Sequence, residues 1–264
     1  MNKLMFDPQV NQNVSLSHSL WIEMITEGLL KREFLYYYQP KYNIDTEEII
    51  GYEALARWNN SQYGAILPMH FIPFIMQNDL WNAFFFNVFS MGLVFQEKIN
   101  QKRNNITFSY NIDVQQLKEF DFADKVNILI ESKKVEFENV IFEVTETSSG
   151  FDNENVTMNL LKFMEKGIKI SMDDYGKSYS SLSRLLKFPF SEIKLDSSYI
   201  QNAVINPNSI NKIERTQVLA KHLGLSFIVE GVENKKQLSI LKSIGCKFAQ
   251  GYYFSKPMHP IEIT

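Results

Sequence analysis

The sequence has one cysteine, Cys246, among its 264 residues. A single thiol excludes an internal disulfide and any all-cysteine zinc or iron-sulfur site, and it suits a reducing compartment. A basic excess is also missing, because 27 lysines and arginines against 30 aspartates and glutamates give a net charge of −3. No overall positive field therefore attracts a nucleic-acid polymer or an anionic membrane, and any phosphate chemistry must be local.

Long hydrophobic runs are missing as well. The most apolar stretch, residues 71–99, is interrupted by residues such as Pro73, Asp79 and Lys98, and a membrane-spanning helix of about 20 apolar residues would not tolerate these interruptions. Residues 1–20 include Asp7 and Pro8 before any apolar run and lack the pattern of a signal peptide. We expect a soluble cytoplasmic protein with a polar, disordered N-terminal arm over residues 1–19 and one domain over residues 20–264.

The remaining composition is that of a folded domain, with 45% hydrophobic and 14% aromatic residues. Short apolar runs alternate with stretches of helical spacing. Strands are predicted at residues 34–39, 49–55, 106–112, 140–144, 168–172, 193–195, 226–229 and 247–249. Helices are predicted at residues 20–31, within 71–99, at 122–132, 156–166 and 181–186, in a long helix ending near 223, and at 235–243.

This alternation predicts the fold class. Strands that are apolar on both faces and alternate with helices indicate a mainly parallel sheet, and about eight units favour a closed TIM-like (β/α)8 barrel. An open doubly wound sheet is the alternative. Against it, the residues after the first run, Gln39, Pro40 and Lys41, offer no glycine-rich turn.

Polar residues stand where the apolar runs stop. In a parallel barrel these strand ends meet at one face, so the side chains would line one cavity. Any one of these residues alone could be a helix cap, a surface ion pair or a backbone-bonded amide; the repetition along the chain favours a shared site. The residues are Glu53, Asn111, Glu143, Asp173, Asp174, Lys194, Glu230 and Gln250.

Five carboxylates in one confined site indicate a metal centre, because like charges a few Å apart repel strongly without cations. Oxygen ligands without cysteine or histidine favour Mg²⁺ or Mn²⁺. The adjacent Asp173 and Asp174 could bridge two such ions, which is an arrangement used for displacement at phosphorus. Lys194 could then hold or deprotonate the attacking water, or neutralise charge in the transition state.

These residues lie in an ordered set of motifs that resembles the EAL domain family, bacterial phosphodiesterases that hydrolyse cyclic di-GMP to linear pGpG. The resemblance covers about residues 20–257. The signature Glu53-Ala54-Leu55 alone is common in helices, and the specificity comes from the whole set. The motifs are YEALARW at 52–58, YYQP at 37–40, FEVTET at 142–147, DDYGKSYSSL at 173–182, IKLD at 193–196, EGVEN at 230–234 and QGYYFSKP at 250–257.

The resemblance implies a role for individual residues. It implies two metal ions, the first held by Glu53, Asn111, Glu143 and Asp173 and the second by Asp173 and Asp174. Lys194 matches the lysine that contacts the catalytic water, and Glu230 matches a glutamate proposed as a base or as a water-mediated ligand; with Glu53 they form the expected catalytic set. The positions that match substrate contacts are Gln39, Leu55, Arg57 and Gln250. The positions that match anchors of the loop after the aspartate pair are Glu146 and Glu233.

The resemblance also implies that the first strand is antiparallel to the others and that the chain forms a homodimer. One departure lies in the loop after the aspartate pair. The family commonly has Asp-Asp-Phe-Gly-Thr-Gly or Asp-Asp-Phe-Gly-Ala-Gly there, whereas this chain has Tyr175, Lys177 and Ser178. The lost glycine restricts the backbone, and Lys177 adds a cation close to the expected metals.

Three functions are therefore open. An active metal-dependent cyclic di-GMP phosphodiesterase fits best, because no expected ligand is missing. A module that binds cyclic di-GMP or a protein without turnover is the alternative, supported by the altered loop at Lys177 and Ser178. A divalent-metal phosphodiesterase with a different nucleotide substrate is the third.

Overall fold

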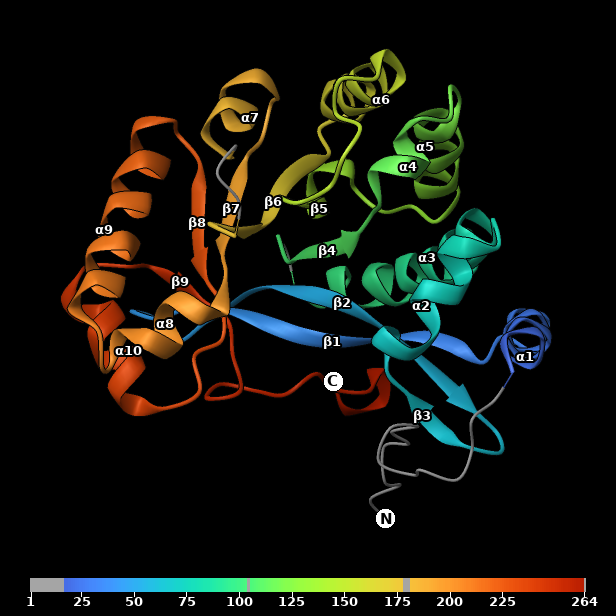
Figure 1. Ribbon diagram of the computed structural model, residues 1–264, viewed down its shortest axis with the longest axis horizontal. Helices are drawn as coiled ribbons and strands as arrows, with labels where there is room; N and C mark the ends of the chain where they lie inside the picture. Colours follow the sequence, from blue (N-terminus) through green and yellow to red (C-terminus); the bar gives the residue numbers. More distant parts are fainter. Residues whose placement is uncertain (1–16, 104, 178–180, 264) are drawn as a thin grey trace.

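The computed structural model describes residues 17–103, 105–177 and 181–263, and it shows a closed barrel (Figure 1). Among these residues the barrel contains eight strands, hydrogen-bonded around the circle in the order β1-β9-β8-β7-β6-β5-β4-β2 and closed by the pairing of β1 with β2. The strands are β1 (Phe34–Asn43), β2 (Ile49–Asn60), β4 (Thr107–Asn111), β5 (Val140–Thr145), β6 (Lys169–Tyr175), β7 (Glu192–Leu195), β8 (Ser226–Val229) and β9 (Phe248–Ala249).

Strand β1 is antiparallel to both of its neighbours, and the other seven barrel strands are parallel to one another. In β1, Tyr37 faces Leu55 of β2, and Tyr42 faces Ala249 of β9. The TIM-like barrel with an antiparallel first strand is confirmed. The alternative of an open doubly wound sheet is wrong, because the first and last strands pair. The sequence did not predict strand β3 (Gly64–Ile66), which extends β2 as a hairpin.

Helices lie around the outside of the barrel (Figure 1). They are α1 (His18–Leu30), α2 (Pro68–Gln77), α3 (Trp81–Asn100), α4 (Val114–Leu117), α5 (Phe122–Ser132), α6 (Glu154–Glu165), α7 (Ser181–Lys187), α8 (Ser197–Ala203), α9 (Pro207–His222) and α10 (Lys235–Ser243). Two short 3-10 turns complete the described elements, η1 (Phe137–Asn139) and η2 (Pro260–Glu262). None of the helices in this part of the chain is long and apolar enough to cross a membrane.

Several element boundaries differ from the prediction. Helix α1 begins at His18, two residues early, because the Ser17 side chain accepts a hydrogen bond from the backbone of Leu20 and caps the helix. The predicted arm falls mostly on residues 1–16, outside the described residues. The apolar stretch 71–99 is two helices, α2 and α3, separated near Asp79, which has a φ of 54°. The long helix ending near residue 223 is also two, because Asn206 caps a new helix with Pro207 in its first turn.

Strand β1 is longer than predicted and continues through Lys41 to Asn43. The aromatic residues of α3 lie between this helix and the barrel, as their spacing predicts. Phe89, which is fully buried, packs against Tyr110 of β4 and Phe142 of β5, with ring centroids 4.8 and 5.7 Å apart. Aromatic packing of this kind fixes the parallel strands whose ends carry the polar residues.

Candidate functional site

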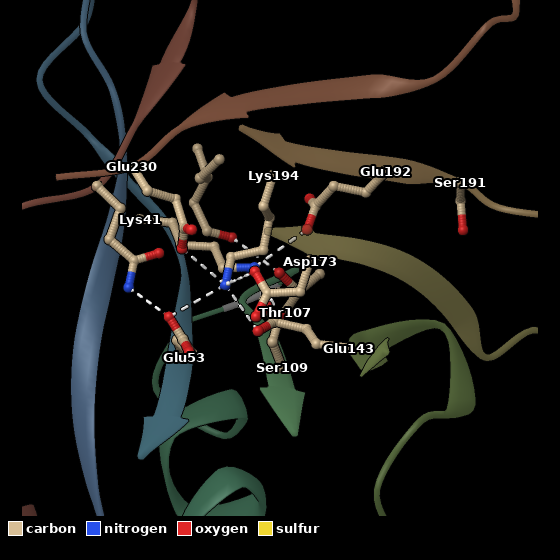
Figure 2. Close-up of polar contacts among 12 residues, drawn as sticks. Lys41, Glu53, Thr107, Ser109, Glu143, Asp173, Ser191, Glu192, Lys194 and Glu230 are labelled. Carbon is tan, nitrogen blue, oxygen red and sulfur yellow. Dashed lines mark hydrogen bonds and ion pairs between the residues drawn. The ribbon is translucent and has the colours of Figure 1, made fainter. Parts of the chain in front are cut away.

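The polar residues predicted to share a site gather around the ammonium group of Lys194, which is fully buried at the end of β7 (Figure 2). Four carboxylates from four other strands, or from the residue that directly follows one, lie within ion-pair distance of its Nζ atom; Glu53 lies within β2 rather than at its end. The distances are 2.7 Å to Glu143, 2.8 Å to Glu230, 3.1 Å to Asp173 and 3.3 Å to Glu53. Residues that are up to 177 positions apart in sequence, from Glu53 to Glu230, therefore meet at the carboxyl ends of the parallel strands.

A second buried lysine, Lys41 of β1, lies deeper in the barrel. Its Nζ atom is 2.9 Å from Glu143 Oε1 and 3.1 Å from Glu192 Oε1, and it donates to Ser109 Oγ at 2.6 Å. The two oxygens of Glu143 thus contact different lysines, Oε1 facing Lys41 and Oε2 facing Lys194. The interior of the barrel holds a connected ionic network rather than a purely apolar core.

The network separates the pKa values of its carboxyl groups. Burial opposes ionisation of Glu143, but Lys194 and Lys41 outweigh it and lower its pKa to about 2. For Asp173, burial and the neighbouring carboxylates outweigh Lys194 and raise the pKa to about 7. Burial likewise raises the pKa of Glu230. The Lys194 ammonium loses hydration on burial, yet the surrounding carboxylates raise its pKa well above the usual value.

The oxygen atoms of this cluster fit hard divalent cations. Carboxylate oxygens of Asp173, Asp174 and Glu230 lie within 4.8 Å of one another. The Asp173 Oδ1 atom is buried and accepts no hydrogen bond of good geometry, although Lys194 Nζ is nearby. An oxygen-only donor set with an unsatisfied buried acceptor is suited to Mg²⁺ or Mn²⁺ rather than to zinc or copper.

Two of the predicted metal ligands lie at the edge of the cluster. Asn111 ends β4 with an exposed side chain, next in register to Glu143 of β5, and no hydrogen bond joins its side chain to another described residue. The Asp174 carboxylate is 2.8 Å from the ammonium of Lys177, which also lies 3.1 Å from Asp196. The cation in the altered loop is therefore paired with a predicted ligand.

A pocket of about 270 Å³ opens beside the carboxylates and contains three of the four predicted substrate-contact residues. Gln39, Leu55 and Gln250 line it together with Glu53 and Glu230. The Gln250 amide joins this wall to the cluster, because its Nε2 donates to Glu53 Oε2 at 2.7 Å and to Gln39 Oε1 at 3.0 Å.

The fourth predicted contact, Arg57, lies farther along β2. Its guanidinium is mostly buried, donates to the carbonyl oxygen of Ala56 at 2.7 Å and lies over the ring of Tyr37 at 5.7 Å. Burial lowers the pKa of Arg57. Its Nε atom is buried without a hydrogen-bond partner.

The two predicted loop anchors have different surroundings. Glu146 Oε2 accepts a hydrogen bond at 3.0 Å from the backbone nitrogen of Gly176, in the loop after β6. Glu233 lines the pocket beside Gln250, and among the described residues no hydrogen bond or ion pair joins its carboxylate to residues 174–177. Within residues 174–177, the loop contact is thus present for Glu146 and not for Glu233.

Sequence reasoning missed Lys41 and Glu192. The signal was a spacing of two residues within a strand, which places side chains on one face: Lys41 follows Gln39, and Glu192 precedes Lys194. The predicted first strand stopped at residue 39 and left Lys41 outside.

The family model described as the EAL domain matches residues 22–257. Cyclic di-GMP phosphodiesterase RocR of Pseudomonas aeruginosa is 38% identical over 234 residues, covering 89% of this chain and 60% of RocR. The chain thus spans about three fifths of that relative's length.

Solved structures agree with this relationship. The PaMucR phosphodiesterase in complex with c-di-GMP has a TM-score of 0.86 and 26% identity, covering 92% of this chain and 99% of the other. An EAL domain protein from Listeria monocytogenes has a TM-score of 0.81 and 28% identity, covering 94% and 96% of the two chains. By motifs, fold and the arrangement of its strand-end carboxylates, this chain belongs to the EAL domain family.

Proposed function

We propose that the chain is a metal-dependent phosphodiesterase that hydrolyses cyclic di-GMP to linear pGpG. The observation that carries the proposal is the pocket lined by Gln39, Leu55 and Gln250, which opens onto Glu53 and Glu230 beside Lys194. The relatives add support, since RocR is named a cyclic di-GMP phosphodiesterase and PaMucR was solved with c-di-GMP.

The proposal includes two Mg²⁺ or Mn²⁺ ions. The carboxylates and lysines in and below the site carry a formal excess of four negative charges, which two divalent ions would balance: the acids are Glu53, Glu143, Asp173, Asp174, Glu192 and Glu230, and the lysines are Lys41 and Lys194. Glu53, Asn111, Glu143 and Asp173 would hold one ion, and Asp173 with Asp174 the other. When bound, such ions activate water and neutralise phosphate charge.

The chain's own residues would direct the water. The Lys194 ammonium, surrounded by the ligands, is placed to hold an attacking water by hydrogen bonding and to face developing negative charge. Glu230, whose pKa burial raises, is placed to take a proton from that water. The water oxygen bonds to phosphorus, one phosphorus–oxygen ester bond breaks, and the departing oxygen takes up a proton, so one ring opening gives the linear dinucleotide.

The substrate residues divide the work of binding. Gln39 and Gln250 present amide groups on one wall of the pocket, and Leu55 adds an apolar surface for a base. Arg57 supplies a guanidinium, whose fork can bind a phosphate by two hydrogen bonds. A homodimer and a cytoplasmic location stay predictions, and sedimentation equilibrium of the purified chain measures the first.

The experiment is incubation of the purified chain with cyclic di-GMP and Mg²⁺ or Mn²⁺, followed by chromatography for pGpG. We expect product from the unmodified chain and a loss of at least about 100-fold in Glu53→Ala, because that change removes a metal ligand and the acceptor of the Gln250 amide. Binding of cyclic di-GMP without product would instead identify a receptor. Hydrolysis of a model diester but not of cyclic di-GMP would indicate another nucleotide substrate.

A further inference from the structure

Lys41 belongs to the ionic network (Figure 2) and pairs in register with Gly51, two residues before Glu53 on β2. Along the contacts that start at Lys194, the charged groups alternate in sign. The order is Lys194, Glu143, Lys41 and Glu192, with successive contacts of 2.7, 2.9 and 3.1 Å. Lys41 is only 1% exposed. Lys41 lies on β1, and the proposed chemistry gives it no role.

A lysine at this depth is costly, so its presence calls for a reason beyond stability. Transfer of an ammonium and two carboxylates from water into a barrel interior has a large desolvation penalty, and apolar residues of similar volume often stabilise a protein as well or better. A barrel core can be filled by branched apolar side chains. We therefore infer the role of Lys41 from the side chains that it contacts.

Lys41 holds one side of a proposed metal ligand. Glu143 Oε1 faces Lys41, and Oε2 faces the site. The contact of Glu143 Oε2 is with the Lys194 ammonium, which also faces three other carboxylates. A divalent cation can therefore replace this contact when it binds. The contact of Glu143 Oε1 with Lys41 is fixed, because the Lys41 ammonium is also held by Ser109 Oγ at 2.6 Å and by Glu192 at 3.1 Å.

We propose that Lys41 is a positioning residue of the metal site: it anchors Oε1 of Glu143 so that Oε2 is presented to a divalent ion in one orientation. This inference rests on the proposed function, in which Glu143 is a metal ligand. Lys41 touches neither substrate nor reacting atoms in this role, and it acts through Glu143. Ser109 and Glu192 hold the Lys41 ammonium in place by accepting its hydrogen bonds.

The direction of the change in cation affinity on removal of Lys41 distinguishes a positioning role from a purely electrostatic one. If Lys41 acted only as a positive charge beside a Glu143 that stays ionised, its removal would strengthen cation binding, because the interior would become more negative. If it positions Glu143, its removal weakens cation binding, because the ligand must be ordered at the moment of binding.

The test measures Mn²⁺ binding by calorimetry on the full chain without nucleotide, comparing Lys41→Met with the matched control Glu192→Gln. Methionine keeps most of the length of the side chain without its charge. Glu192→Gln keeps an oxygen that can accept from the Lys41 ammonium, and it leaves the contact between Lys41 and Glu143 in place. We expect the Mn²⁺ dissociation constant to rise at least tenfold in Lys41→Met and less than twofold in Glu192→Gln. In the cyclic di-GMP assay at saturating metal, Lys41→Met should lower kcat while KM changes less than twofold.

Equal or tighter Mn²⁺ binding by folded Lys41→Met would overturn the inference, as would equal damage from Glu192→Gln. If Lys41→Met fails to fold, the double variant Lys41→Met with Glu192→Gln removes one unpaired carboxylate and is held to the same tenfold expectation. An unmodified chain that binds no Mn²⁺ would contradict the proposed metal site itself, and this inference with it. Normal binding by both chains contradicts the positioning role alone.

Discussion

Lys177 is the residue at which the departure from the family motif touches the site directly. Its ammonium pairs with Asp174 at 2.8 Å and with Asp196 at 3.1 Å. Desolvation opposes the charge of Lys177, but the hydrogen bonds to these two aspartates outweigh it and raise its pKa. A cation bound through Asp174 must displace this ion pair, so Lys177 competes with the second proposed metal ion.

Replacement of Lys177 by alanine should therefore tighten Mn²⁺ binding. The lysine side chain is 45% exposed, and solvent screens such pairs to roughly 0–1 kcal/mol, so the expected gain in affinity is only about two- to fivefold. Calorimetric titration with Mn²⁺ measures it. Lys187→Ala is the matched control, since Lys187 pairs with the exposed Asp152. Unchanged or weaker binding in Lys177→Ala would show that the ion pair does not oppose the metal.

At the scale of elements, Gly176 in the loop after β6 is held from two sides. Its backbone nitrogen donates to Glu146 Oε2 at 3.0 Å, and its carbonyl oxygen accepts from the Tyr199 hydroxyl at 2.7 Å. Gly176 has a φ of 101°, and a Cβ there would lie 2.5 Å from the Tyr199 hydroxyl. Glycine is thus required by both conformation and space, and Asp174 lies two residues before it at the end of β6.

Loss of the Glu146 contact should loosen the loop and misplace Asp174. We expect Glu146→Ala to lower kcat for cyclic di-GMP at least about tenfold, because a small displacement of a ligand is costly in a preorganised site. Glu146→Gln keeps an acceptor for Gly176 and should retain most of the activity. Steady-state assays and thermal unfolding of both variants check this. Equal losses in the two variants would indicate that the charge of Glu146, rather than its hydrogen bond, matters.

The elements also show how far sequence reasoning reaches. Apolar runs predicted all eight barrel strands, because strands buried on both faces need continuous apolar residues. The alternation of strands with helices predicted the parallel strands, but periodicity does not distinguish the direction of a single strand. The antiparallel direction of β1 came only from the family resemblance. Breaks such as Asp79, between α2 and α3, were missed because both helices are apolar and continue the same spacing.

The site was predictable where a charged residue interrupts or ends an apolar run, as Glu143 and Lys194 do. Lys41 was not, because its partners Ser109, Glu143 and Glu192 lie 68 to 151 residues away. Likewise, no local pattern pairs Lys177 with Asp196. Which ion pairs form depends on which strands the closed barrel brings together, and this cannot be read from neighbours in sequence.

At the scale of the whole molecule, the buried carboxyls couple stability to pH. The pKa of Asp173 is raised from 3.8 to about 7, so the folded chain keeps a proton that the unfolded chain releases. This contribution to stability is complete below about pH 4 and is lost as the pH rises towards 7. The low pKa of Glu143, about 2 against an ordinary 4.5, has the opposite effect, but in a window below pH 4.5.

For the metal-free protein, the free energy of unfolding should therefore fall between pH 5 and pH 7, by up to about 1.4 kcal/mol per pH unit. Urea unfolding in the presence of a chelator measures this slope, and Asp173→Asn should reduce it. Added Mn²⁺ should stabilise the protein more at pH 7.5 than at pH 5, because the ion binds the ionised carboxylates. A stability that is flat or rises with pH in the chelated protein would contradict the raised pKa.

The hydrogen bonds of Gln250 join parts of the chain that are synthesised far apart in time. Its amide donates to Gln39 and Glu53, which precede it by 211 and 197 residues, and β9 meets β1 beside this contact. Contacts over such separations carry a large entropic cost of loop closure, so we expect them to form late in folding. The wall of the pocket therefore exists only once the barrel has closed, and a fluorescent nucleotide added to a refolding or translating sample would report completed barrels and no earlier intermediate.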